Sequence, residues 1–214
     1  MGELIAVLSG KGGTGKTSVT AAVASALALS GRKILCIDCD VGLRNLDISL
    51  GLADLCPLSF LDVCEGGYPI SQAAVHPQFP TLHFLTAPMS CPPEQIDPER
   101  FGAFLMRVRN LYDYIFLDAP AGVEAGFKLT ATFADRCIIV TGPGPAAVRD
   151  AARTAQVLEL MGKANIRLVV NRVNTKLVRA MDTTIDDVMD TAGLPLLGIV
   201  PEDKNGTLAA TFNH

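Results

Sequence analysis

The chain has 214 residues, 49 % of them apolar, and a formal net charge of −4. The length and the apolar share predict a single domain over residues 1–214 rather than a disordered chain, and no apolar run reaches the about 18 residues that span a bilayer. The acidic balance gives no electrostatic case for a nucleic-acid partner, because DNA-binding surfaces are usually basic.

Short runs rich in Val, Ile and Leu alternate along the chain with longer segments of helical periodicity. The first run has no basic region before it and is too short for a secretory signal, so we expect a cytoplasmic protein. Strands are expected at residues 4–8, 33–37, 82–85, 114–117, 137–140, 168–170 and 196–200. Helices are expected at residues 16–29, 98–111, 146–161 and 185–191, with a short one near 60–64. Several strands are apolar throughout, which predicts an α/β fold: a mostly parallel sheet with helices on both faces.

Local signals mark the ends of two of these helices. Gly31 is a plausible C-terminal cap of the helix at 16–29, and Asp97 before Pro98 is typical of a helix start. The helix expected at 98–111 places its large apolar residues on one face, namely Phe101, Phe104, Leu105, Val108 and Leu111.

Residues 10–17 read Gly-Lys-Gly-Gly-Thr-Gly-Lys-Thr, which satisfies the phosphate-loop pattern G-x-x-x-x-G-K-[ST]. The loop follows the first strand and opens the first helix, a context that a chance glycine-rich turn would lack. Glycines let backbone N–H groups converge on phosphates at a positive helix end, Lys16 can bridge the β- and γ-phosphates, and the Thr17 hydroxyl can ligate Mg²⁺. We therefore expect ATP or ADP with Mg²⁺, bound by Lys11, Gly12, Gly13, Thr14, Gly15, Lys16, Thr17 and Ser18.

Acidic residues follow two other strands near the same edge of the sheet. Asp38 and Asp40 close the second strand, and Asp118 follows a strand that looks like a Walker B segment. Asp118 suits the outer shell of Mg²⁺, so the expected metal-binding residues are Thr17, Asp40 and Asp118. No glutamate adjoins Asp118, which leaves Asp40 as the candidate that orients the attacking water; the alternative is an ordinary carboxylate at a strand end.

The extra lysine at position 11 gives the loop K-G-G-T-G-K-T, which resembles the deviant Walker A signature of the MinD/ParA family of P-loop ATPases. Residues 38–47, Asp-Cys-Asp-Val-Gly-Leu-Arg-Asn-Leu-Asp, resemble the first switch segment of the division-site members of that family. Segments 119–124, 147–150 and 198–203 are also similar, in the same order. The resemblance covers essentially the whole chain.

The resemblance implies an ATP-dependent homodimer in which Lys11 crosses to the nucleotide of the second copy, with Lys11, Lys16 and Asp40 as the catalytic residues. It further implies a slow ATPase that switches cell-division site placement, together with a partner of the division-inhibitor or ATPase-activator type. A base pocket is implied as well, formed by Asn171, Arg172, Pro201, Glu202 and Asp203. A solvated lysine and ordinary turn residues are the simpler readings of these positions.

The chain departs from the family at its C-terminal end. Members of the division-site branch continue into a further helix and a basic amphipathic helix that holds the dimer on the membrane, whereas this sequence stops at residue 214. We therefore regard membrane binding by this chain as doubtful. Residues 54–93 are less like the family, and they receive no functional interpretation.

Three other functions remain open at this point. A flagellar-number regulator has nearly the same switch segment, and a DNA-partition ATPase shares the loop but would want a basic surface. An iron–sulfur carrier needs closely spaced surface cysteines. The pair at metal-like spacing here is Cys36 and Cys39, which a strand would send to opposite faces, so reduced core thiols are expected.

Overall fold

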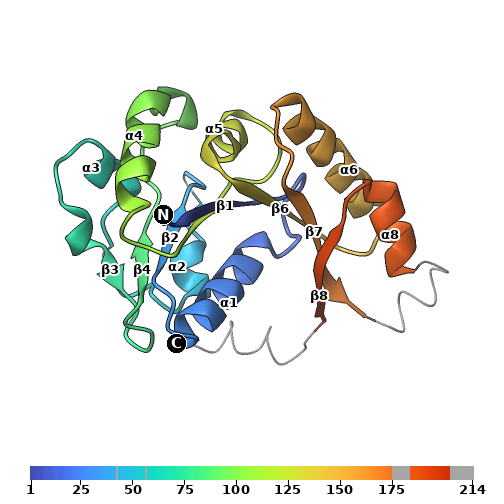
Figure 1. The fold of residues 1–214 in the computed structure, drawn as a ribbon, viewed down its shortest axis with the longest axis horizontal. Coiled ribbons are helices and arrows are strands. Elements are labelled where there is room, and N and C mark those ends of the chain that lie inside the picture. Colours follow the sequence, from blue (N-terminus) through green and yellow to red (C-terminus); the bar gives the residue numbers. More distant parts are fainter. Residues whose placement is uncertain (42, 56, 175–183, 203–214) are drawn as a thin grey trace.

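The fold is known from a computed structural model that describes residues 1–41, 43–55, 57–174 and 184–202 (Figure 1). Its centre is an eight-stranded sheet in the order β3-β4-β2-β5-β1-β6-β7-β8. The β3–β4 pair is antiparallel, and all other neighbouring strands run parallel. This confirms the α/β class and the mostly parallel sheet that the sequence predicts.

The strands of this sheet are β1 Glu3–Leu8, β2 Ile34–Asp38, β3 Ala74–Val75, β4 Leu82–Leu85, β5 Tyr114–Asp118, β6 Arg136–Thr141, β7 Ile166–Val173 and β8 Leu196–Pro201. The α-helices in the described ranges are α1 Lys16–Leu29, α2 Leu46–Ser49, α3 Phe60–Cys64, α4 Pro98–Val108, α5 Ala125–Phe133, α6 Pro145–Leu160 and α8 Ile185–Ala192. Two short 3₁₀ helices, η1 Ile70–Gln72 and η2 Pro93–Gln95, lie in the connections.

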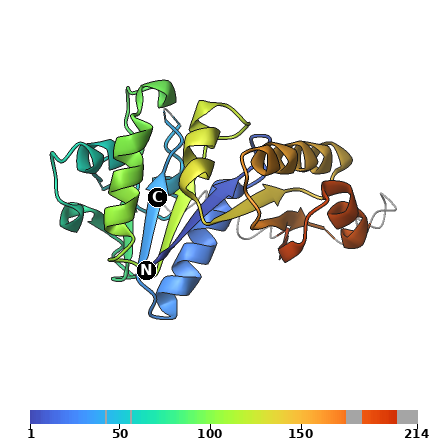
Figure 2. The ribbon, with the colours of Figure 1, turned by 45° about the horizontal axis from the view of Figure 1, so that its top comes forward.

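Helices cover both faces of the sheet, as the uniformly apolar strands require. Along β1, Leu4 packs with residues of α3 and α4, and Leu8 packs with residues of α5, α6 and α8. Ile5 and Val7, which point the opposite way, pack with residues of α1 and α2. Figures 1 and 2 show α4, α5 and α6 on one side of the sheet and α1 on the other. No helix in the described part of the chain is long and apolar enough to cross a membrane.

The helix predicted at 98–111 is shorter than expected, because α4 ends at Val108. If the helix continued, the N–H of Asp113 would donate to the carbonyl of Arg109. Instead, the N–H of Asp113 donates to the carbonyl of Lys33, and the carbonyl of Arg109 accepts a hydrogen bond from the N–H of Gly2. Leu111 therefore lies outside the helix and is 51 % exposed, which corrects its assignment to the apolar face. The other four residues of that face are buried: Phe101, Phe104, Leu105 and Val108.

Both predicted helix boundaries are confirmed. The Asp97 carboxylate accepts hydrogen bonds from the N–H groups of Glu99 and Arg100 at the start of α4. Gly31 follows the end of α1 with φ +84°, the left-handed conformation that glycine adopts without a steric penalty.

Among the α-helices and strands of the described residues, the sequence does not predict α2, α5 and β3. Helix α5 includes Gly126, a poor helix former, but a Cβ there would lie 2.6 Å from the ring of Pro120, so the glycine permits close packing of the preceding loop. Helix α2 and strand β3 are only four and two residues long, too short for a periodic signal.

The two strands that carry the phosphate loop and Asp118 are neighbours in the sheet, and the helices that follow them depart to opposite faces. Helix α1, after β1, packs on one face, whereas α5, after β5, packs on the other. Such a divergence opens a crevice beyond the carboxyl ends of the strands, where ligands of α/β sheets bind.

Candidate functional site

The loop between β1 and α1 has the backbone that its glycines predict. Gly13 and Gly15 take φ values of +80° and +84°, and Gly15 is the residue before the first helical residue. A Cβ at Gly15 would lie 2.2 Å from Nδ2 of Asn171, so a larger residue does not fit there. The loop therefore ends directly on the helix N-terminus, with its N–H groups free to face an anion.

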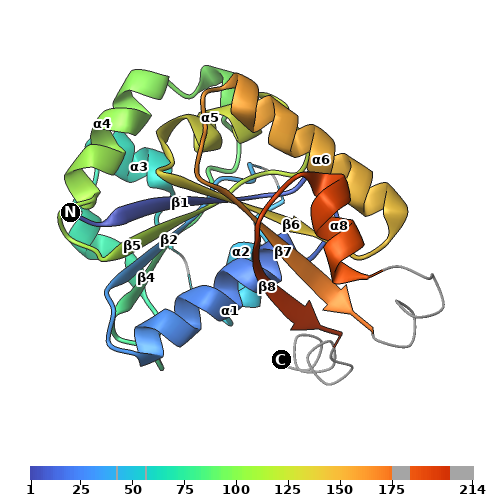
Figure 3. The same cartoon turned by 45° about the vertical axis from the view of Figure 1, so that its right-hand side comes forward.

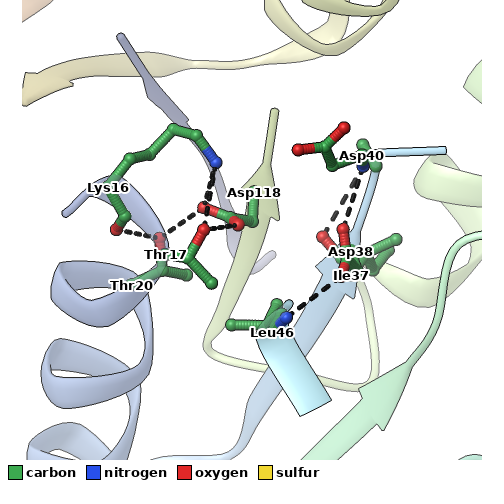
Figure 4. Close-up of polar contacts among 9 residues, drawn as sticks. Lys16, Thr17, Thr20, Ile37, Asp38, Asp40, Leu46 and Asp118 are labelled. Atoms are coloured by element: carbon green, nitrogen blue, oxygen red, sulfur yellow. Dashed lines mark hydrogen bonds and ion pairs between the residues drawn. The ribbon is translucent and has the colours of Figure 1, made fainter. Parts of the chain in front are cut away.

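Lys16, Thr17 and Asp118 meet where α1 begins (Figure 4). The Lys16 ammonium lies 2.9 Å from Oδ1 of Asp118 and donates to the Thr17 hydroxyl at 3.3 Å. The Thr17 hydroxyl donates to Oδ2 of Asp118 at 2.7 Å. Asp118 is 1 % exposed and Lys16 is 6 % exposed, so this ion pair is buried.

Asp38 holds the segment that follows β2. Its Oδ1 accepts a hydrogen bond from the N–H of Asp40 at 2.9 Å, and its Oδ2 accepts one from the N–H of Leu46 at 3.2 Å. Burial, together with the nearby charge of Asp118, raises the pKa of Asp38 to about 6, against the opposing effects of the two backbone hydrogen bonds and of Lys16. The carboxylate therefore closes the loop from residue 40 to residue 46, of which Gly42 lies outside the described residues.

Asp40 is placed differently from Asp38, although they are two residues apart. In Figure 4 its carboxylate lies on the side of Lys16 and Asp118. The carboxylate of Asp40 makes no hydrogen bond or ion pair within the described ranges, whereas its backbone N–H donates to Asp38. Burial raises its pKa, while the positive charge of Lys16 opposes that rise. Asp40 is thus a half-buried carboxylate that is available to a ligand.

A cavity of about 360 Å³ lies beside the phosphate loop. Residues 11–14 form one wall. The other walls come from the turn after β6 and the start of α6, from the end of β7 and from the residue after β8, namely Gly142, Pro143, Gly144, Ala147, Arg172 and Glu202. Lys11 is exposed at this cavity and, within the described part of the chain, makes no hydrogen bond or ion pair. Ser18 is exposed on the first turn of α1.

The residues predicted to bind the base lie at the ends of β7 and β8, which stand side by side in Figure 3. The Asn171 amide donates to the carbonyl of Thr14 at 2.8 Å, so this side chain supports the phosphate loop. Arg172 is exposed and takes φ +56°, a left-handed conformation that is unusual for a residue with a side chain. Glu202 accepts a hydrogen bond from Asn174 at 2.7 Å and lies after the exposed Pro201. Asp203 is outside the described residues.

Sequence reasoning missed three parts of this site. Asp38 received no role of its own, although its place two residues before Asp40 could have suggested one. No sequence pattern marks Thr20, whose hydroxyl lies 2.8 Å from Oδ1 of Asp118, one helical turn after Lys16. The Gly142-Pro143-Gly144 loop was also missed, although a glycine-rich turn directly after a strand of a parallel sheet is a recognisable signal.

The donor set fits a nucleotide with Mg²⁺ rather than a metal held by protein alone. Among the described residues, no group of three or more His, Cys, Asp or Glu side chains could hold a metal ion. The Thr17 hydroxyl and the Asp118 carboxylate lie together beside the phosphate loop. In such sites phosphate oxygens and retained waters supply the remaining Mg²⁺ ligands. Cys36 and Cys39 pack into clusters on opposite faces of the sheet, and burial raises both thiol pKa values, as expected for core thiols.

The comparisons with known proteins agree with this geometry. The sequence profile of the CobQ/CobB/MinD/ParA nucleotide binding domain matches residues 5–213. The septum site-determining protein MinD of Synechocystis sp. is 39 % identical over 206 residues, which cover 95 % of this chain and 77 % of that protein. A chain of the MinC:MinD cell division protein complex of Aquifex aeolicus is similar with a TM-score of 0.89, at 36 % identity over 99 % of this chain and 86 % of that chain. The septum site-determining protein MinD of Pyrococcus horikoshii, complexed with Mg-ADP, gives a TM-score of 0.82 at 31 % identity over 98 % and 86 % of the two chains.

Proposed function

Because this chain belongs to the CobQ/CobB/MinD/ParA family of nucleotide-binding domains, we propose that its site drives an ATP-dependent switch in the placement of the cell-division site. The chain is an Mg²⁺-dependent ATPase that converts ATP to ADP and phosphate. The observation that carries this function is the meeting of Lys16, Thr17 and Asp118 where the phosphate loop enters α1. The similar protein of Pyrococcus horikoshii is bound to Mg-ADP.

In this proposal each residue of the phosphate loop has a distinct task. The N–H groups of residues 12–18 bind the phosphates, and Lys16 leaves Asp118 to contact the β- and γ-phosphates. Thr17 and Asp118 would hold Mg²⁺, which would supply positive charge against the phosphate oxygens.

Asp40 orients the water that attacks the γ-phosphate. Its carboxylate is half-buried, makes no hydrogen bond or ion pair within the described residues and lies on the side of Lys16, which supports the role. Phosphoryl transfer depends mainly on positioning and charge stabilisation, so a carboxylate with a fixed backbone serves even as a weak base. Asp38 fixes that backbone through the N–H of Asp40.

The base of the nucleotide lies between the ends of β7 and β8. Asn171 and Arg172 form one side of this pocket, and Pro201, Glu202 and Asp203 form the other. The cavity beside the loop supports the proposal, because Arg172 and Glu202 line it together with residues 11–14.

A second copy of the chain completes the site when ATP is bound. Lys11 would then reach the nucleotide of the second copy. Its exposure and the absence of a hydrogen bond or ion pair within the described residues support this role. In the monomer the Lys11 ammonium stays hydrated, so it carries no desolvation penalty. In the dimer it gains a charged phosphate as hydrogen-bond partner.

A partner of the division-inhibitor or ATPase-activator type binds the ATP-bound form. The similar Aquifex aeolicus chain comes from a complex with MinC. A hollow of about 420 Å³ between α6 and α8 shares Pro143 with the nucleotide cavity. We place the protein in the cytoplasm, which the free and mostly buried cysteines of the described residues support.

The mass in solution tests the switch. With Asp40→Ala to block turnover, ATP and Mg²⁺ should give twice the 22.6 kDa mass of the chain, whereas ADP should give the monomer. The double variant with Lys11→Ala should bind ATP as a monomer. A monomer in ATP without the Lys11 change would contradict the dimer, and absence of ATP binding would contradict the nucleotide site itself.

A further inference from the structure

Asp118 is the point at which the site would change when ATP binds, and the inference drawn from it rests on the proposed function. The carboxylate is 1 % exposed and has three side-chain partners in the described chain. Lys16 and Thr20 contact Oδ1 at 2.9 Å and 2.8 Å, and Thr17 contacts Oδ2 at 2.7 Å. Figure 4 shows these contacts converging from the first turns of α1 onto the end of β5.

Phosphate binding removes the only cation among these partners. In the proposed function the Lys16 ammonium, which lies 2.9 Å from Oδ1, turns to the β- and γ-phosphates. A buried carboxylate that loses its charged partner carries a large desolvation penalty unless other donors stay in place. Thr17 remains near Oδ2, but its oxygen is then also engaged with Mg²⁺.

Thr20 is the donor to Oδ1 that ATP does not displace. It lies one turn after Lys16 on the same helix face, is 1 % exposed, and its hydroxyl reaches both Oδ1 of Asp118 and the carbonyl of Lys16, at 2.8 Å and 3.1 Å. The single hydroxyl proton favours the charged acceptor at the shorter distance. The Lys16 carbonyl keeps its helical N–H partner in either case.

We propose that Thr20 is a positioning residue that holds Oδ1 of Asp118 after Lys16 has moved to the phosphates, and so keeps Oδ2 directed at Thr17 and the bound Mg²⁺. No other described hydroxyl, amide or cation contacts Oδ1. Asp38 cannot replace it, because its like charge repels Asp118.

The expected consequence is a change in Mg²⁺ dependence and not in nucleotide binding as such. Thr20→Val keeps the shape of the side chain and removes the hydroxyl. Binding of a fluorescent ADP analogue without Mg²⁺ should stay within about twofold of wild type, whereas the Mg²⁺ concentration for half-maximal enhancement of binding should rise about tenfold. Thr20→Ser, which restores the hydroxyl, should return that concentration to within about twofold of wild type.

Thr130→Val is the matched control. Thr130 is also fully buried in a helix and donates to the carbonyl four residues earlier, that of Gly126 at 2.7 Å, but it does not contact Asp118. It should lower the melting temperature by a similar amount and leave the Mg²⁺ dependence unchanged.

A folded Thr20→Val variant with wild-type Mg²⁺ dependence would overturn the proposal. If that variant does not fold, Thr20→Ser and Thr20→Cys give the same test at nearly equal volume, because a thiol is a weaker donor than a hydroxyl. Equal Mg²⁺ dependence of this pair would also overturn it. A wild-type chain that binds no nucleotide would overturn the proposed function, whereas normal wild-type binding with unchanged variants would overturn the role of Thr20 alone.

Discussion

The phosphate side and the base side of the candidate site differ in how firmly the fold holds them. The phosphate side lies at the ends of central strands β1, β2 and β5, where Lys16, Asp38 and Asp118 are buried and bonded to one another or to backbone. The base side lies at the ends of β7 and β8, and β8 is the last strand of the sheet. There Arg172 and Glu202 are exposed.

This difference suggests a division of labour. Buried side chains already have restricted conformations, so the phosphate side loses little conformational entropy on binding, even though Lys16 exchanges Asp118 for the phosphates. Exposed side chains at a sheet edge lose conformational entropy on binding and are screened by solvent, so they contribute less to affinity. Binding free energy should therefore be concentrated on the phosphate side. Substitutions on the two sides test this difference in binding free energy.

The largest effect is expected at Lys16. Lys16→Ala removes the charge that meets the β- and γ-phosphates, and nucleotide affinity should fall about 100-fold or more, because hydrogen bonds between ionised groups are the strong ones. Titration calorimetry with ATP and Mg²⁺ measures the loss. Lys128→Ala removes an exposed lysine of α5 and serves as the control for net charge. Unchanged ATP affinity in Lys16→Ala would contradict the phosphate-loop assignment.

Asp38→Asn should change the pH dependence of stability. Burial raises the folded-state pKa of Asp38 from 3.8 to about 6, so its contribution to the free energy of unfolding is fully present below pH 3.8 and is lost as the pH rises through 6. At about 1.4 kcal/mol for each pKa unit, the wild type should lose at most about 3 kcal/mol relative to Asp38→Asn across that window.

Urea unfolding at pH 4 and at pH 7 measures this difference between Asp38→Asn and the wild type. Asp54→Asn, which alters an exposed carboxylate, is the control. Parallel pH profiles for Asp38→Asn and the wild type would contradict the buried, proton-binding state of Asp38.

The sequence predicts the elements at the centre of the sheet better than those whose bounds depend on contacts with distant residues. Central strands such as β1 and β6 are buried on both faces and appear as continuous apolar runs, so their prediction is accurate to one or two residues. The end of α4 could not be predicted, because it depends on a hydrogen bond from Gly2 to Arg109 over a long sequence separation. Helix α5 carries a glycine that is explained only by its packing against Pro120.

The candidate site divides in a similar way. The phosphate loop with Lys16 and Thr17 is a local pattern, and the structure brings both to Asp118, as the strand order implies. The hydrogen bond from Thr20 in α1 to Asp118 in β5 joins residues far apart in the sequence, so no local sequence pattern predicts it. The contact of Asn171 with the Thr14 carbonyl depends on the same kind of packing. The assignment of Asn171 and Arg172 to the base pocket remains a prediction.

Substitution of Arg172 should reduce ATP affinity less than substitution of Lys16. Two variants at this position separate the role of the side chain in binding from the role of the backbone in stability. Arg172→Ala and Arg172→Gly both remove the guanidinium, and each should weaken ATP binding about threefold to tenfold, as for an exposed contact. The native φ is +56°, so Arg172→Gly should be more stable than Arg172→Ala by about 1 kcal/mol.

Melting temperature and ATP titration on the same two samples separate these effects. A loss of ATP affinity as large as that of Lys16→Ala would mean that the base side contributes as much binding free energy as the phosphate side. Equal stability of the glycine and alanine variants would contradict the left-handed backbone at residue 172.

The smallest effect is expected on the edge strand β8. Ile199 is 44 % exposed there, whereas Ile139 in β6 is fully buried in the same sheet. Ile199→Thr should change the free energy of unfolding by no more than about 0.5 kcal/mol, because neither a cavity nor a buried hydroxyl results. Ile139→Thr creates both and should cost about 3 kcal/mol. Urea unfolding of the pair measures the difference, and an equal loss in both variants would mean that β8 is held as tightly as the centre, so that the base side is as pre-organised as the phosphate side.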